Sequence, residues 1–175
     1  MFQFIKRLFT KEEKPMKSTI SDEICIQRLM VNEGCRLRAY RCPAGKLTIG
    51  IGRNLDDNPL TKEELEYVGH DCRKQFISND QAAYLCRNDL KRVRKQLDDN
   101  LSWWQDLSPD RQFVMIDLCF NMGINTLLTF KRTLSSIAGG YYIRAGEQLL
   151  QSKYAKQVGK RAERNAECLQ TGVYR

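Results

Sequence analysis

The segment EGCRLRAYRCPAGKLTIGIG, residues 33–52, contains one acidic side chain and two others that could complement it in catalysis. Glu33 is the only carboxyl group of the segment, and Cys42 and Thr48 follow after eight and then five intervening residues. A carboxyl in a crevice between a helix and a sheet is partly desolvated, which raises its pKa and suits it to general acid catalysis. Cleavage of a glycosidic bond needs such an acid and a second group that activates water or stabilises the developing cation. The spacing alone leaves open that Glu33 is only a solvated residue at a helix end.

The residues around Glu33 predict a helix followed by a small sheet. A helix is expected from Ser21 to about Asn32, because apolar side chains recur there at helical spacing. Residues 35–57 change character: RLRAY and KLTIGIG are typical of short strands, and CPAG between them is typical of a turn. Glu33 should therefore lie where the first helix meets a small antiparallel sheet.

The remainder of the chain predicts mainly helices. Two capping boxes mark helix starts, Thr61 with Glu64 and Ser78 with Gln81. The second begins a long helix near 79–98 that could bridge two lobes. Ser108-Pro109 begins a helix that is apolar nearly all round and therefore central, with Gly123 as its expected C-cap. Three further helices are expected near 125–138, 141–153 and 160–169. The predicted fold class is α+β, with a small antiparallel sheet lobe at about 35–57 and a larger helical lobe joined by the long helix.

The charge of the chain favours polyanionic partners. The 175 residues carry a formal net charge of +8, which predicts attraction to nucleic acid, anionic lipid or an acidic cell-wall polymer. No nucleic-acid-binding signature is present, so nucleic acid is not an expected partner. No apolar run approaches the roughly 18 residues that a membrane span needs.

Seven cysteines and a single histidine, His70, argue against several kinds of site. The cysteine spacing contains no CxxC and no Cys/His cluster, so a zinc site is not expected. A histidine-dependent hydrolase would have to rely on His70 alone. We therefore interpret the cysteines as reduced thiols in a reducing cytoplasm, and we expect neither a metal nor a cofactor.

Residues 1–20 are predicted to form a basic amphipathic leader ahead of a domain that spans 21–175. Phe2, Ile5 and Phe9 would lie near one face of a helix. Weak contact with an anionic membrane surface is one interpretation of this pattern. A frayed leader, or one that docks on the domain, is the other.

The motif of Glu33, eight residues, Cys42, five residues and Thr48, running into TIGIG, resembles the signature of the T-even type phage lysozyme family, glycoside hydrolase family twenty-four. FNMGINTLLTF (120–130) is similar to the end of that family's central helix. SKYAKQVGKRAERNAECLQTG (152–172) is similar to its C-terminal segment. Order and spacing are kept over nearly the whole predicted domain. The resemblance implies a lysozyme-like fold.

The resemblance also implies catalytic roles. Glu33 would be the general acid, and Thr48 would help to hold the attacking water or the sugar from the opposite side. Cys42 stands where many family members have aspartate, and three roles stay open for it: a thiolate base for water, a covalent nucleophile, or a polar residue that only shapes the water site. A thiol, with a reference pKa of about 8.5, is mostly neutral unless its surroundings lower that value. Asp117 stands where asparagine is frequent and is a minor rival to Cys42.

The same alignment implies further site residues. Four positions match residues that line the saccharide cleft of the family: Asn54, Phe120, Thr133 and Gln148. Arg161 matches an arginine that pairs with the catalytic glutamate. Arg53 stands where the family often has histidine, and Asp89 where the carboxylate partner of that histidine lies. An Arg53–Asp89 ion pair should therefore link the sheet to the long helix in a structural role.

Together these resemblances imply an endolysin. It would be a muramidase that hydrolyses the β-1,4 bond between N-acetylmuramic acid and N-acetylglucosamine in peptidoglycan glycan strands and so lyses the host cell. A monomer is expected, kept in the host cytoplasm until a separate holin allows its release to the periplasm. The alternatives are a lytic transglycosylase that uses Glu33 alone, and a non-catalytic lysozyme-fold protein that binds the wall. A basic nucleic-acid-binding helical domain ranks last.

Overall fold

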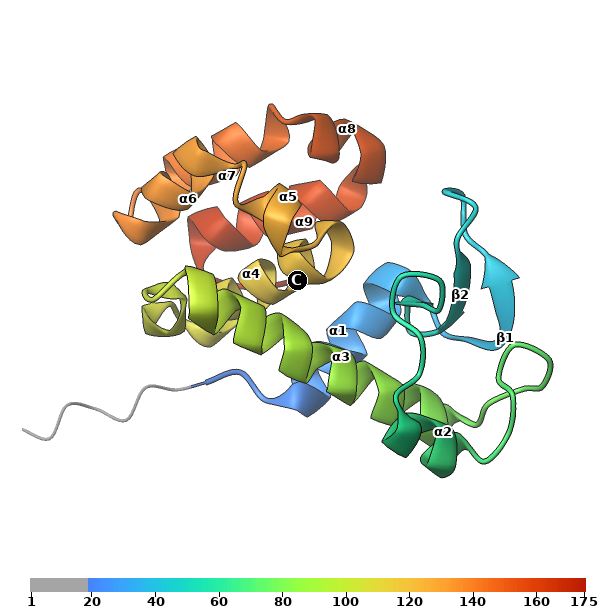
Figure 1. Cartoon of the computed structure of the whole chain (residues 1–175). Helices are drawn as coiled ribbons and strands as arrows, with labels where there is room; N and C mark the ends of the chain where they lie inside the picture. Colours follow the sequence, from blue (N-terminus) through green and yellow to red (C-terminus); the bar gives the residue numbers. More distant parts are fainter. Residues whose placement is uncertain (1–18) are drawn as a thin grey trace, which may run out of the picture.

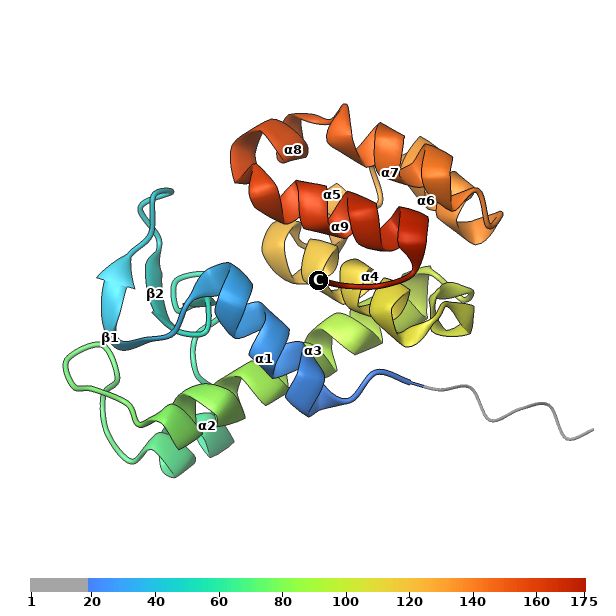
Figure 2. The same ribbon diagram turned by 180° about the vertical axis from the view of Figure 1, so that it is seen from behind.

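The computed structural model describes residues 19–175, so the helix considered for the leader lies outside the described residues. A small sheet lobe lies at one end of the molecule and a larger helical lobe at the other (Figures 1 and 2). One long helix, α3 (Asn79–Asn100), runs from one lobe to the other. The fold is therefore the α+β arrangement that the sequence predicts.

Helix α1 (Asp22–Glu33) ends at the junction between the lobes, and Glu33 is its last residue. Its N-terminus is capped by Ser21, whose hydroxyl accepts a hydrogen bond from the backbone N–H of Ile24 at 3.3 Å. The helix ends at Gly34, whose φ of 73° lies in a region that favours glycine. Glu33 is thus the last helical residue, and the chain turns from it directly into the sheet.

The sheet is antiparallel and follows the chain order of its strands: β1 (Arg36–Arg41), β2 (Leu47–Gly50) and β3 (Arg53–Asn54). Tyr40 of β1 lies opposite Thr48 of β2. In the turn between these strands, the backbone N–H of Cys42 donates to the carbonyl of Lys46 at 2.9 Å. The turn therefore brings Cys42 close to Thr48 on the returning strand.

Helices α2 (Lys62–Val68) and α3 begin at the two capping boxes recognised in the sequence. In both, the cap side chain and the side chain three residues later each accept a backbone hydrogen bond from the other residue. The predicted apolar positions of α3 are all buried: Cys86, Leu90, Val93 and Leu97. Helix α3 packs against α1, the sheet and the helical lobe, and so ties the lobes together. Like the other helices of residues 19–175, it lacks the combined length and apolar character needed to cross a membrane.

Helix α4 (Pro109–Met122) forms the centre of the helical lobe. Proline occupies its first turn, and Gly123 follows its last residue with a φ of 77°, as the sequence predicts. Every residue from Gln112 to Cys119 is buried. The helix is therefore enclosed on all sides, which explains why its sequence is apolar nearly all round.

The last third of the chain divides into more helices than expected, although the helix expected near 160–169 is present as α9 (Lys160–Thr171). The other helices of this part are α5 (Ile124–Leu127), α6 (Lys131–Ala138), α7 (Tyr142–Leu150) and α8 (Lys153–Val158). A short 3₁₀ turn, η1 (Trp104–Asp106), lies earlier, between α3 and α4. The helix expected near 125–138 is interrupted at Phe130, whose ψ of 44° is not helical. The helix expected near 141–153 ends at Leu150, because Ser152 caps the separate helix α8.

Candidate active site

The carboxyl group of Glu33 lies against the backbone of the turn between β2 and β3. Gly52 in this turn has a φ of 72°, and a Cβ at that position would stand 3.2 Å from both Cγ and Cδ of Glu33. Such a contact is tighter than side chains normally make, so glycine lets the carboxyl approach the sheet this closely. The side chain of Glu33 remains 20% exposed. It is therefore held between α1 and the sheet with one side open to solvent.

Arg161 of α9 holds Glu33 from the helical lobe. Its Nη1 donates to Oε1 of Glu33 at 2.6 Å, while Nε and Nη2 donate to the two carboxylate oxygens of Asp117 in α4 at 3.0 and 2.7 Å. Burial alone would lower the pKa of Arg161, but the hydrogen bonds and charge of Asp117, and then those of Glu33, raise it. The guanidinium therefore stays charged between two carboxylates.

Asp117 is fully buried, and its oxygens are occupied. Besides Arg161, Asn32 donates to Oδ1 at 2.9 Å and Asn165 donates to Oδ2 at 2.7 Å. A carboxylate without access to solvent cannot activate a water molecule that attacks a bound sugar. This geometry argues against Asp117 as the rival to Cys42 and indicates that it serves Arg161 instead.

Cys42 and Thr48 approach each other beside the β1–β2 turn. Partial burial acts to raise the pKa of the Cys42 thiol. Hydrogen bonds from the backbone of Lys46 and Ala44 and from the hydroxyl of Thr48 outweigh burial, so the pKa of Cys42 lies below its ordinary value. In the structure the buried Thr48 hydroxyl donates its single proton to the Lys46 carbonyl at 3.1 Å, so the backbone N–H groups contribute most to the lowered pKa of Cys42. The turn therefore shifts Cys42, relative to an ordinary cysteine, toward the thiolate, the form that acts as a base or a nucleophile.

Cys42 differs in this respect from the other cysteines. All seven are free thiols, and burial raises the pKa of each of the other six, to about 11 for Cys25 and Cys119. Within residues 19–175, no three His, Cys, Asp or Glu side chains are grouped to hold a metal ion. Cys42 is thus the cysteine of the chain whose surroundings favour reactivity.

Tyr40 of β1 lies within electrostatic range of both Glu33 and Cys42. Burial is the main reason that the pKa of Tyr40 is raised; Arg36 opposes the shift, and the charges of Glu33 and Cys42 add to it. In the described part of the chain, neither Cys42 nor Thr48 hydrogen bonds to Glu33. The structure therefore gathers the predicted catalytic residues around the β1 strand without joining them directly.

The four predicted saccharide-binding residues line two separate hollows. Asn54 and Phe120 line a cavity of about 430 Å³ between the sheet lobe and helices α3 and α4. Thr133 and Gln148 line another, of about 400 Å³, where α6 begins and α7 ends. Glu33 lines neither hollow. The structure thus pairs these residues two by two and does not bring all four together.

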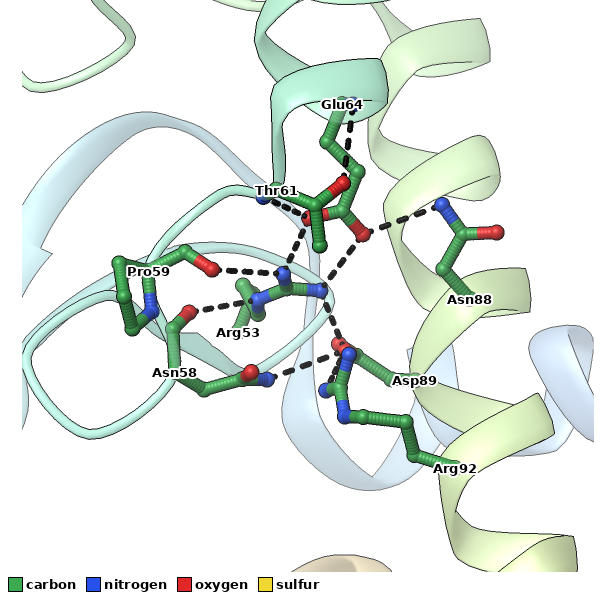
Figure 3. A network of polar contacts seen from close by, with 8 residues as sticks. All are labelled: Arg53, Asn58, Pro59, Thr61, Glu64, Asn88, Asp89 and Arg92. Carbon is green, nitrogen blue, oxygen red and sulfur yellow. Dashed lines mark hydrogen bonds and ion pairs between the residues drawn. The ribbon is translucent and has the colours of Figure 1, made fainter.

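Arg53 of β3 is the centre of a second network of buried charges (Figure 3). It contacts Asp89 of α3, so the two residues expected to pair do lie together, and it donates to Oε2 of Glu64 in α2 at 2.5 Å. Arg92 contacts the same oxygen of Asp89. The side chains of Arg53 and Glu64 are each 1% exposed. This network joins the sheet to two helices and leaves neither of its carboxylates open.

Sequence reasoning missed several members of these networks. A capping box identifies Glu64 as a helix-start residue but does not reveal its contact with Arg53. Asn165 lies four residues after Arg161, so both project from the same face of α9. Asn32 directly precedes Glu33 in α1. The placement of Asn165 near Arg161 and of Asn32 beside Glu33 was the available sequence signal. Only the fold shows that both asparagines donate hydrogen bonds to Asp117.

Comparison with known proteins adds independent findings. The Phage lysozyme family model matches residues 31–167. Probable T4-type lysozyme 1 of Dictyostelium discoideum is 27% identical over 170 residues, which cover 90% of this chain and 97% of the relative. The endolysin of Acyrthosiphon pisum secondary endosymbiont phage 1 is 29% identical over 129 residues, 74% of this chain and 77% of that protein. The SAR-endolysin of Escherichia phage P1 is 31% identical over 98 residues, 56% of this chain and 45% of that protein.

Proposed function

The chain belongs to the phage lysozyme family, and we propose that it hydrolyses the β-1,4 bond between N-acetylmuramic acid and N-acetylglucosamine in peptidoglycan. The family that the motif at residues 33–52 resembles is confirmed by the match, and the chain is an enzyme of the lysozyme type that cleaves glycosidic bonds. The choice of bond and the residue roles below are the proposal. The observation that carries it is the position of Glu33, part-exposed at the lobe junction and fixed there by Arg161 and Gly52.

In this proposal Glu33 is the general acid. It donates its proton to the glycosidic oxygen as the bond to the muramic acid residue breaks. The 2.6 Å contact with Arg161 and the close packing on Gly52 fix the direction of the carboxyl before substrate binds. Such fixed orientation reduces the reorganisation needed at the moment of proton transfer.

Cys42 and Thr48 form the opposite side of the site in this proposal. The Cys42 thiolate removes a proton from a water molecule held by the Thr48 hydroxyl, and the resulting hydroxide attacks the anomeric carbon while Glu33 protonates the leaving oxygen. The lowered pKa of Cys42 supports the thiolate state, and its contact with Thr48 supports a shared water site. A base at position 42 predicts inversion at the anomeric carbon, whereas direct attack by sulfur would give retention. The anomer released by the enzyme therefore separates the two roles.

The test is the loss of turbidity of Gram-negative cells whose outer membrane has been permeabilised. We expect Glu33→Gln to be inactive, Cys42→Ala to be severely impaired and Cys42→Asp to be active, because aspartate also supplies an anionic base. Lysis by Glu33→Gln at the wild-type rate would contradict the role of the acid. Lysis by Cys42→Ala at that rate would show that the thiol takes no part.

The proposal extends to the lytic role. We propose that the protein is made as a monomer in the host cytoplasm and reaches the wall through a membrane lesion formed by a separate holin. The name endolysin of one phage relative supports release to the wall, whereas the SAR-endolysin relative points to a different export route. Expression in a Gram-negative host with and without a holin tests the route. Lysis only with the holin is expected, and equal lysis without it would contradict holin dependence.

A further inference from the structure

Glu33 shares its arginine with a second carboxylate that substrate cannot reach. Arg161 makes two contacts with Asp117 and one with Glu33, and the Asp117 side chain is fully buried. When Glu33 is ionised, the three groups carry a net charge of −1. When Glu33 takes up a proton, Arg161 and Asp117 remain as a neutral pair. Without Asp117, the protonated acid would leave a buried guanidinium with no counter-charge, which is strongly unfavourable.

We propose that Asp117 is a positioning residue for the catalytic acid: it fixes Arg161 and balances its charge, so that Glu33 can hold the proton that it donates. The inference rests on the proposed role of Glu33 as the general acid. It assigns a function to a residue that never contacts the sugar. It also explains why a buried carboxylate stands beside the site without taking part in activation of water.

The hydrogen bonds of Asp117 reach two of the elements that hold the acid, α1 and α9. Asn32, the residue before Glu33 in α1, donates to Asp117 at 2.9 Å, and Asn165 of α9 donates at 2.7 Å. Arg164 in turn donates to Oδ1 of Asn32 at 2.6 Å. The Asp117 carboxylate on α4 is therefore linked to both α1 and α9. Any displacement of Asp117 would move Asn32 and Arg161, which flank Glu33.

Other titratable or charged groups near Glu33 do not replace this balance. They come from several elements: Tyr40 on β1, Cys86 on α3, Tyr154 on α8, and Arg164 beside Arg161 on α9. Burial raises the pKa of the first three, so they are uncharged at neutral pH. The Cys42 thiolate of the proposed function is a further anion near Tyr40, but Asp117 is the one that hydrogen bonds to Arg161 and so offsets the guanidinium in contact with Glu33.

The test compares the pH dependence of kcat/KM for wild type and Asp117→Asn. Both chains are measured in the Cys42→Asp background, in which the base ionises at low pH, so that the alkaline limb of the profile reports the group that must be protonated, Glu33 in the proposed function. Removing the negative charge of Asp117 favours ionised Glu33, so the limb should move to lower pH by about one unit or more. Activity would then fall about tenfold at pH values above the limb and recover in acid. An unchanged profile would overturn the inference.

A second comparison repeats the test in a background that keeps a carboxylate. Asn32→Asp combined with Asp117→Asn moves the acidic group to the other end of the 2.9 Å hydrogen bond between them. Relative to Asn32→Asp alone, the double variant should again show the alkaline limb at lower pH. Relative to Asp117→Asn, it should recover part of the lost activity. If the limb does not move in the first comparison and activity does not recover in the second, Asp117 does not act on Glu33.

Two controls separate the possible failures. Asp89→Asn removes a buried carboxylate from Arg53, which retains Glu64, and should lower stability without moving the alkaline limb. Glu33→Gln tests the proposed function itself. If Glu33→Gln keeps its activity, the role of the acid is wrong. If Glu33→Gln is inactive but Asp117→Asn keeps the wild-type profile, only the inference about Asp117 is wrong.

Discussion

Within residues 19–175, two arginines each lie between two carboxylates, and the two arrangements differ in one respect. Arg53 lies between Glu64 and Asp89, whose side chains are 1% and 5% exposed. Arg161 lies between Asp117, at 0%, and Glu33, at 20%. The first arrangement is sealed on both sides and the second is open on one. The same three chemical groups therefore form a structural brace in the sheet lobe and a candidate acid site at the lobe junction.

The contrast shows what burial does to a charge network. A sealed network depends on every partner, because a buried charge that loses its counter-charge is strongly destabilising. In an open network, the exposed carboxylate can exchange its proton with solvent or substrate. The buried arginine and the second carboxylate remain a neutral pair meanwhile. Exposure of one carboxylate, more than the identity of the groups, separates the functional network from the structural one.

The largest expected difference between the networks is in activity. Glu33→Gln should reduce the rate of lysis by about 10²–10⁴-fold, the usual contribution of a general acid. Glu64→Gln, its counterpart in the sealed network, should leave the rate per folded molecule near that of wild type. Both variants are measured by turbidity loss, with circular dichroism to determine the folded fraction. Similar activity losses in the two folded variants would contradict a functional difference between the two networks.

The sealed network should show the largest effect on stability. Arg53→Met leaves Glu64 and Asp89 buried without their main counter-charge, so the free energy of unfolding should fall by about 3–5 kcal/mol. Urea unfolding monitored by circular dichroism measures the loss. Arg41→Met is the matched control, because the Arg41 side chain is 70% exposed, and it should change stability little. Equal stability of the two variants would contradict the structural role of Arg53.

Alkylation tests the group that lies opposite Glu33, the thiol of Cys42. Iodoacetamide should inactivate wild type at a rate that rises with pH up to the lowered pKa of Cys42, because the thiolate is the reactive form. Cys42→Asp should resist inactivation. It should also stay active to lower pH than wild type, because an aspartate ionises well below a thiol. Residual activity against pH and reagent concentration tests both statements. Inactivation of Cys42→Asp at the wild-type rate would place the sensitive cysteine elsewhere.

The pH dependence of stability tests the sealed network again, with a smaller effect. Burial acts to raise the pKa of Glu64, but hydrogen bonds from the Thr61 backbone, Arg53 and Asn88 outweigh it and lower that pKa. The contribution of Glu64 is therefore complete above its unfolded-state pKa of about 4.3 and is lost as pH falls through the lower folded-state value. The stability difference between wild type and Glu64→Gln, from urea unfolding, should shrink between pH 7 and pH 3. A stability difference that grows as pH falls would contradict the lowered pKa of Glu64.

The smallest expected effect concerns the outer edge of the open network. Asn32 donates to the hydroxyl of Tyr174 at 3.0 Å, and the Tyr174 ring packs edge-on against Phe113 with centroids 4.6 Å apart. Tyr174→Phe removes the hydroxyl and keeps the ring, so stability should fall by about 0.5–1.5 kcal/mol. The lysis rate should change less than about twofold, because Asp117 still holds Asn32 and Arg161. Thermal unfolding and turbidity loss measure both effects, and a rate loss as large as that of Asp117→Asn would contradict this order.

The elements that the sequence predicts well are those with local signals. Ser78 and Gln81 mark the start of α3, and proline and glycine mark the two ends of α4, because capping depends on residues only a few positions apart. The break at Phe130 was not predicted, because no capping side chain marks it. The break at Ser152 was missed although Ser152 is a local cap that accepts from the backbone N–H of Ala155. Local signals therefore predict where long helices begin and end better than how short ones divide.

The candidate site divides in the same way. Glu33, Cys42 and Thr48 lie within one short motif, so the sequence could indicate them. Arg161 lies 128 residues from Glu33, and only the family resemblance suggested their contact. The link from Asn32 to Asp117 joins residues 85 positions apart and has no sequence signature. Long-range hydrogen bonds between common polar residues are the part of a site that one sequence does not reveal.

The most direct test of the central proposal is digestion of purified peptidoglycan in H₂¹⁸O, followed by mass spectrometry of the released muropeptides. Hydrolysis by wild type should place one ¹⁸O atom on each new muramic acid reducing end, and Glu33→Gln should release almost none of these products. Unlabelled anhydro-muramic ends from wild type would instead identify a transglycosylase. Equal labelled release by wild type and Glu33→Gln would contradict the assignment of Glu33 as the catalytic acid.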